Sequence, residues 1–119
     1  MECGDGVGDP VLLRTNMKAA SISPPSYPSA AHHIVAGNAQ LAEPAAAHLE
    51  ILGIDANHWA NGVFLPYLEW GSGAYHRGLH TNAYYEAVNE IVLQARTKQE
   101  AIEALRYIAD RLMNNMFPY

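Results

Sequence analysis

The apolar residues near the C-terminal end of this chain recur at helical spacing. Between about residues 80 and 96 they lie three and four positions apart, which predicts an amphipathic helix. The residues of this stripe are Ala83, Tyr84, Ala87, Val88, Ile91 and Val92. A second helix is expected after Thr97, because Thr97 and Glu100 form a capping box in which each side chain accepts the backbone N–H of the other. Its buried stripe comprises Leu105, Ile108, Ala109 and Leu112.

Shorter elements are predicted earlier in the chain. Residues 13–20 can form a short helix, whereas residues 21–29 hold three prolines and must be extended or turned. The apolar segment 31–35, which contains the adjacent pair His32 and His33, is typical of a short strand. Residues 62–66 predict a second strand that ends at a proline.

The segment between these strands carries the boundary signals of a helix over residues 43–52. Pro44 fits the first helical turn, and Gly53 is a C-terminal stop. Residues 54–61 are then expected to form a loop, whose polar residues are Asp55, Asn57 and Asn61. The predicted order is therefore helix, strand, helix, strand and two helices.

Length and composition predict one globular domain. A chain of 119 residues suits a single core, which we place in residues 13–119, after a poorly ordered lead or domain boundary in residues 1–12. No apolar run reaches about 18 residues, so no transmembrane helix is expected, and the first residues lack the features of a signal peptide. The single cysteine, Cys3, excludes an internal disulfide and Cys/His zinc clusters.

The formal net charge of −5 counts against a nucleic-acid partner, because phosphate binding normally relies on Lys and Arg. A bound divalent cation and protonated histidines add local positive charge that this count omits. An acidic surface can also serve a basic or polar protein partner. The charge therefore weakens a nucleic-acid function without excluding it.

Four of the six histidines occur in two close pairs. His32 and His33 are neighbours on a predicted strand, so their side chains point to opposite sides, and one can hold a metal while the other faces water or substrate. His76 and His80 share a face if they lie on a helix, where they can converge on one ion. Imidazole is the common metal ligand and titrates near neutral pH. The alternative for each pair is a core or surface histidine without chemistry.

Two further residues belong to this argument. The spacing of His76 and His80 also occurs in metalloproteases of the H-E-x-x-H type, but Arg77 occupies the position of their general base, which disfavours a protease. Asn61 can use its amide to hold loop backbone and so fix the histidine strand against its partner. The alternative is turn chemistry in Asn61-Gly62, a favoured hairpin dipeptide. His48 is expected to have a packing or surface role. Neither His48 nor His58 is expected to act directly, and His58, in the loop near Asn61, is the better candidate of the two.

Several separated motifs in this order resemble the AHH family. They are Ala31-His32-His33, residues 52–55, residues 60–66, His76-Arg77-Gly78-Leu79-His80, residues 83–85 and residues 88–89. The family comprises predicted nucleases of the HNH/endonuclease VII superfamily, often found as modules of bacterial polymorphic toxins, and the resemblance covers roughly residues 13–95. It implies an α+β fold with a ββα-metal, treble-clef-like HNH core: two short strands, a helix across them and a divalent ion between, with additional helices that make the domain mostly helical.

The resemblance also implies roles for individual residues, by analogy with colicins of the DNase type. Their motif likewise begins with two adjacent histidines and ends in H-x-x-x-H. His32 would be a metal ligand, and His33 the general base that activates water. Asn61 would be the motif asparagine that orders the site. His76 and His80 would be further metal ligands, and the alternative is that both help position water.

The implied activity is that of a metal-dependent endonuclease, which hydrolyses phosphodiester bonds. HNH relatives favour DNA as the substrate, with RNA as the alternative. One divalent ion per site is expected, with Mg²⁺, Mn²⁺, Ni²⁺ and Zn²⁺ as candidates, and Arg77 would contact a substrate phosphate. A toxin effector would have a cognate immunity protein and a larger carrier polypeptide or secretion machinery. It would be made in a bacterial cytoplasm, secreted without a signal peptide and active in the recipient cytoplasm, with no membrane partner. The alternative is a non-enzymatic, zinc-stabilised binding module in which imidazoles close a tetrahedral site.

Overall fold

The computed structural model describes residues 9–36, 40–66 and 81–118. In these residues, helices accompany a two-stranded antiparallel sheet, so the fold is a small α+β domain. The elements are α1 (Pro10–Ala19), β1 (Ser29–His33), the 3-10 helix η1 (Gln40–Ala42), α2 (Glu43–Ile51), the 3-10 helix η2 (Trp59–Asn61), β2 (Gly62–Pro66), α3 (Asn82–Val92) and α4 (Lys98–Met113). No helix in these ranges is both long and apolar enough to span a membrane.

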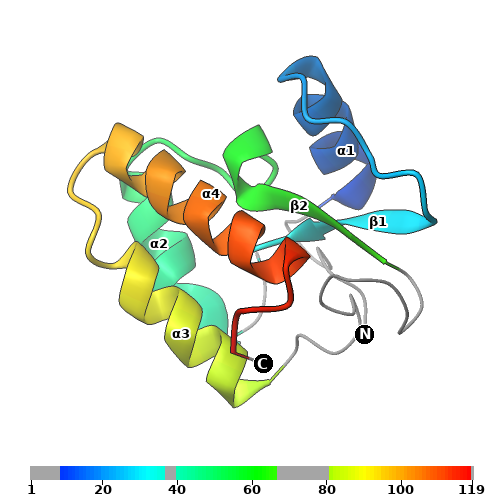
Figure 1. Ribbon diagram of the computed structural model, residues 1–119. Helices are drawn as coiled ribbons and strands as arrows, with labels where there is room; N and C mark the ends of the chain where they lie inside the picture. The colour runs from blue at the N-terminus through cyan, green and yellow to red at the C-terminus, as the bar shows by residue number, and fades with distance from the viewer. Residues whose placement is uncertain (1–8, 37–39, 67–80, 119) are drawn as a thin grey trace.

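The two strands form the centre of the fold, with helices on both faces (Figure 1). β1 pairs with β2 from Ser29 opposite Pro66 to His33 opposite Gly62. α1 covers one face, where its Leu13 and Met17 pack in a small cluster with residues of both strands. α2, α3 and α4 enclose the main core on the other face, which takes up alternate residues of β2. Both faces of β1 are therefore buried, although the sheet has only two strands.

The helix predicted for residues 13–20 is confirmed and begins earlier, at Pro10. The carboxylate of Asp9 accepts the backbone N–H groups of Val11 and Leu12 at 3.0 and 3.3 Å. Pro10 fits the first helical position because it has no N–H to satisfy there. Residues 9–12, which the sequence placed in a poorly ordered lead, thus form the cap and first turn of α1. Residues 1–8 lie outside the described residues.

The helix predicted for residues 43–52 is confirmed as α2, together with its stop at Gly53. Gly53 adopts a φ of +87°, the left-handed region that favours glycine. Its N–H donates to Glu50 O at 3.0 Å, and the N–H of Ile54 donates to Leu49 O at 2.9 Å. These two bonds make a Schellman motif, which satisfies the last carbonyl groups of the helix.

The last two helices are confirmed with corrections at their boundaries. α3 spans Asn82–Val92 within the expected 80–96, and Thr81 caps it. The predicted apolar stripe of α4 is fully buried. Thr97 Oγ1 accepts the N–H of Glu100 at 3.1 Å as expected. The other half of the capping box is wrong, because the Glu100 carboxylate accepts the N–H of Arg96 at 2.9 Å and not that of Thr97.

The first strand lies two residues earlier than predicted, whereas β2 has the predicted bounds. β1 ends at His33 and not at Val35. Beyond it, the N–H of Ile34 donates to Asn61 O at 2.8 Å, and Val35 is bound by the Asn61 side chain. Beyond the last residue pair of β1 and β2, hydrogen bonds to Asn61 therefore take the place of those to a partner strand.

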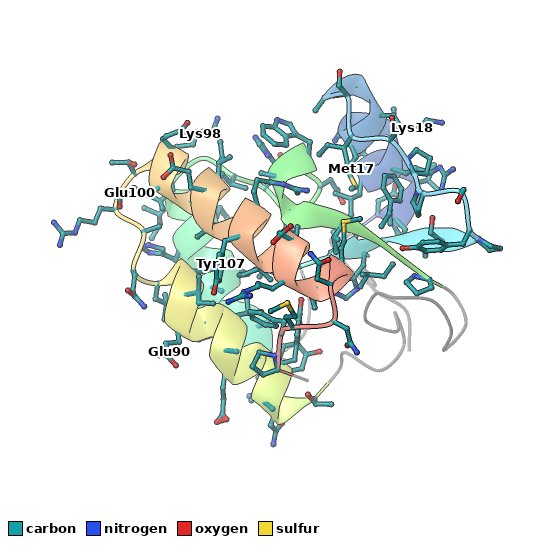
Figure 2. The ribbon with its side chains drawn as sticks, viewed as in Figure 1. Met17, Lys18, Glu90, Lys98, Glu100 and Tyr107 are labelled. Atoms are coloured by element: carbon teal, nitrogen blue, oxygen red, sulfur yellow. The ribbon has the colours of Figure 1, made fainter. Side chains whose placement is uncertain are left out.

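The close packing of α1 on the sheet requires glycine at position 62. A Cβ there would overlap Met17 Sδ and would lie 2.9 Å from Leu13 Cδ1. Both side chains are fully buried, and Met17 lies between α1 and the sheet (Figure 2).

We expect Gly62→Ala to lower the free energy of unfolding by about 1–3 kcal/mol, the usual cost of overpacking a tight core. Urea denaturation measures the change. Met17→Ala removes the side chain that the new methyl group would overlap. The same Gly62→Ala change should therefore lower the free energy of unfolding by less in a Met17→Ala background. An equal cost in both backgrounds would contradict this account of the glycine.

Candidate functional site

The adjacent histidines of β1 are both buried, each with 1% of its surface exposed. His32 faces α3, where its Nε2 lies 3.3 Å from the Tyr84 hydroxyl. His33 faces the loop before η2, where its Nε2 lies 2.9 Å from Asn57 Oδ1. The expectation that the two imidazoles point to opposite sides of the strand is therefore confirmed, as strand alternation requires. Each imidazole has its own surroundings and can serve a different purpose.

Tyr84 connects His32 to the backbone that follows β1. Its hydroxyl donates to Ile34 O at 2.6 Å. A phenol has only one proton, so the contact with His32 can be a hydrogen bond only if His32 Nε2 donates to the hydroxyl oxygen. α3 is thereby joined to β1 beside the first histidine of the pair.

His33 has one engaged ring nitrogen and one free one. Nε2 contacts Asn57, whereas Nδ1 is buried and has no hydrogen-bond partner in the part of the chain that the structure describes. Burial lowers the pKa of His33 below its ordinary value of 6.5, although the hydrogen bond to Asn57 and the charge of Asp9 act weakly in the opposite direction. The imidazole is therefore neutral near pH 7. A neutral ring with a free lone pair can accept a proton or bind a metal.

Asn61 holds the backbone that follows the histidine pair. Its Oδ1 accepts the N–H of Val35 at 2.9 Å. Its Nδ2 donates to Val35 O at 3.1 Å and to Ala56 O at 2.9 Å. These are the backbone contacts expected of this amide. The alternative, a hairpin turn at Asn61-Gly62, is wrong, because Gly62 is extended (φ −116°, ψ 150°) and belongs to β2.

The start of β2 is held by Arg106 of α4, a contact that was not predicted from the sequence. Arg106 Nη1 donates to Ala60 O at 3.1 Å and to Gly62 O at 2.7 Å. Burial lowers the pKa of this guanidinium. Arg106 directly follows Leu105 of the buried stripe, and nothing in the sequence marks it for this role. It fixes the strand opposite His33.

The two remaining described histidines have structural contacts. His58 caps η2, where its Nδ1 accepts the N–H of Ala60 at 3.0 Å. Burial and the nearby Lys98 lower the pKa of His58, against a smaller effect of Asp55. His48 Nε2 lies 2.6 Å from Ala95 O, which joins α2 to the segment after α3. The contact of His48 agrees with the packing role predicted for it, and His58 has a local capping role.

A cavity of about 480 Å³ adjoins the loop that carries Asn57 and Asn61. Its lining is divided between apolar and polar residues, and the polar ones include the acidic residues Glu50 and Asp55. Two carboxylates repel a phosphate, so this cavity does not suit the backbone of a nucleic acid.

The second histidine pair and the predicted phosphate contact lie outside the described residues. These are His76, His80 and Arg77. Among the residues that the structure does describe, no three His, Cys, Asp or Glu side chains are grouped to hold a metal. Of the predicted metal ligands, only His32 therefore has a position here.

We expect the metal-free protein to lose stability as the pH falls below 6.5. The unfolded state then binds a proton at His33 that the folded state does not, because the folded pKa is lower. The contribution of His33 to the free energy of unfolding is complete above pH 6.5. It decreases as the pH falls toward the folded pKa, by at most about 1.4 kcal/mol per pH unit. Urea unfolding with EDTA at about pH 7.5 and 5.5 measures the loss. His33→Gln, which does not titrate, should lose less, and an equal loss in both proteins would contradict the assignment.

Comparison with protein-family models adds a family to this geometry. Residues 13–112 match the AHH model, described as a nuclease family of the HNH/ENDO VII superfamily with conserved AHH. The triplet in this chain is Ala31-His32-His33, at the end of β1. Comparisons with curated proteins and with solved structures gave no match. Because the family model covers most of the chain, this protein belongs to the AHH nuclease family of the HNH/endonuclease VII superfamily.

Proposed function

We propose that this domain is a metal-dependent endonuclease that hydrolyses phosphodiester bonds of DNA. Membership of the AHH family implies a hydrolytic nuclease. The single observation that carries the mechanism is the free nitrogen of His33, which is buried and without a hydrogen-bond partner in the described residues. A neutral histidine with an unprotonated ring nitrogen can take a proton from water at neutral pH.

His33 acts as the general base in this proposal. It takes a proton from the attacking water, the oxygen of that water bonds to phosphorus, and the bond to the leaving 3′ oxygen breaks. General base catalysis by a placed histidine contributes about 10²–10⁴-fold in rate. Burial disfavours the protonated ring, so His33 afterwards releases the proton to solvent. The ring is then neutral again and can act in another cycle.

One of the proposed ligands of a divalent ion lies within the described residues, at the end of β1. His32 supplies a buried imidazole, and His76 and His80 are the further proposed ligands. His80 precedes Tyr84 by only four residues in the sequence, and Tyr84 contacts His32. This short connection supports a ββα-metal arrangement of β1, β2 and α3. When bound, such an ion polarises the phosphate and stabilises the leaving oxygen.

The substrate and biological role follow the family resemblance. Arg77 would contact a phosphate, and readout would be through the backbone with little base specificity. The domain would be a secreted antibacterial toxin that acts in the cytoplasm of a recipient cell. A cognate immunity protein and a larger carrier polypeptide or secretion machinery would be its partners.

The proposal is tested by plasmid cleavage with the purified protein. The assay is run with EDTA, then with Mg²⁺, Mn²⁺, Ni²⁺ and Zn²⁺ in turn, beside an RNA substrate. We expect EDTA to abolish cleavage and at least one ion to restore it. If no ion supports cleavage of DNA or RNA while Zn²⁺ raises the melting temperature, the nuclease proposal fails and a zinc-stabilised binding module replaces it.

A further inference from the structure

We propose that Asn57 is a positioning residue that holds His33 as the neutral tautomer with its proton on Nε2. This inference rests on the proposed function, because it concerns the general base. The loop before η2 places Asn57 Oδ1 2.9 Å from His33 Nε2, although 24 residues separate the two in sequence. No sequence motif pointed to this pair.

The orientation of the Asn57 amide is fixed by a backbone group. The N–H of Asp9 donates to Asn57 Oδ1 at 2.8 Å. A backbone N–H can only donate, so the atom that faces it must be the amide oxygen and not the NH₂ group. The assignment of oxygen and nitrogen in this amide therefore follows from its neighbour.

The tautomer of His33 follows in turn. The amide oxygen has two lone pairs and no proton, so it can accept from both Asp9 N–H and His33 Nε2. Nε2 must then carry the proton. A neutral imidazole has only one N–H, which leaves the lone pair on Nδ1, the buried atom without a partner in the described residues. The hydrogen-bond pattern thus selects Nδ1 as the atom that receives a proton from water.

Asn57 is itself held firmly by its backbone. Its N–H donates to Asp55 Oδ1 at 2.8 Å, and its carbonyl accepts from Asn16 Nδ2 at 2.7 Å. Both Asn16 and Asp9 belong to α1 or its cap. Asp9 precedes residue 13, where the family match begins. The start of α1 therefore contributes to the positioning of the base from outside the matched region.

Ring ¹⁵N chemical shifts of histidine test the inference without any measurement of cleavage. In the metal-free protein at neutral pH, His33 should show a protonated Nε2 and an unprotonated Nδ1. Asn57→Ala removes the acceptor but none of the backbone bonds of this residue, and it should give a mixture of tautomers. Asn57→Asp keeps an oxygen acceptor and should preserve the wild-type tautomer. A wild-type His33 with its proton on Nδ1 would overturn the inference, whichever variants fold.

Cleavage rates provide the second measurement. Loss of the partner that orients a metal-bound histidine costs about 10- to 100-fold, and we expect a loss of the same order for the partner of the base. Asn57→Ala should therefore cleave about 10- to 100-fold more slowly, and Asn57→Asp should recover most of the rate. Asn89→Ala is the matched control, because it removes two side-chain bonds to the backbone, at Ala45 and Leu41, away from His33. An equal loss in Asn89→Ala would indicate general destabilisation and overturn the positioning role. If the wild type cleaves nothing but the tautomer changes as described, the nuclease proposal fails while the structural inference stands.

Discussion

Replacement of His33 with alanine is expected to abolish cleavage and to leave metal binding nearly intact. The change removes the proposed base, whose contribution is about 10²–10⁴-fold in rate. His32, the proposed ligand, faces Tyr84 on the opposite side of β1 and keeps its contacts. Plasmid cleavage measures the first effect, and calorimetric titration with divalent ions measures the second.

Two companion variants separate this result from a loss of folding. His33→Gln retains a donor that can reach Asn57 Oδ1, so it should fold like the wild type and remain inactive. His80→Ala, in contrast, should weaken metal binding first. If His33→Ala loses metal and activity together, the division of roles between base and ligand is wrong.

Local signals in the sequence were sufficient for most of the elements. The stop of α2 at Gly53 and the cap of α4 at Thr97 depend on bonds that span three to five residues. Such bonds form wherever the right residues have the right spacing, so they can be recognised without a tertiary structure. The opposite orientation of His32 and His33 also follows from strand geometry alone.

The contacts that complete the site depend on the tertiary fold. Asn57 meets His33 across 24 residues, and Arg106 meets Gly62 across 44. Neither residue has a sequence signal for such a role, because an Asn in a loop and an Arg on a helix are ordinary. The packing of α4 on the sheet brings Arg106 to β2 (Figure 1). Asn57 reaches His33 because its loop is bonded to Asn16 of α1 and to the cap residue Asp9. The roles of His76, His80 and Arg77 stay predictions.

The backbone around the histidine pair is held by side chains more than by a sheet. The strands share only five residue pairs, from Ser29–Pro66 to His33–Gly62. Beyond these pairs, the side chain of Asn61 bonds the backbone of Val35, and Arg106 bonds the start of β2. The base and the metal ligand proposed on β1 would need fixed positions, and these polar contacts fix the strand end. Loss of such a contact should therefore affect the whole fold.

Asn61→Ala is expected to cost more stability than any other single change considered for this protein. It leaves the buried N–H and carbonyl of Val35 and the carbonyl of Ala56 without their partners. Each buried polar group left unsatisfied costs about 1–3 kcal/mol, so we expect a total loss of about 3–5 kcal/mol. The total free energy of unfolding of a domain of this size is only about 5–15 kcal/mol. The midpoint of urea unfolding should fall accordingly.

Asn114→Ala is the control for this prediction, because it removes a side-chain hydrogen bond from Asn114 Nδ2 to Asp110 O on an exposed surface. That change should stay within about 0.5 kcal/mol of the wild type. Asn61→Asp keeps the acceptor for Val35 N–H but turns both donor contacts into repulsive pairs of oxygens, so it should not restore stability. Equal unfolding midpoints for Asn61→Ala and Asn114→Ala would show that the Asn61 amide does not hold the histidine strand.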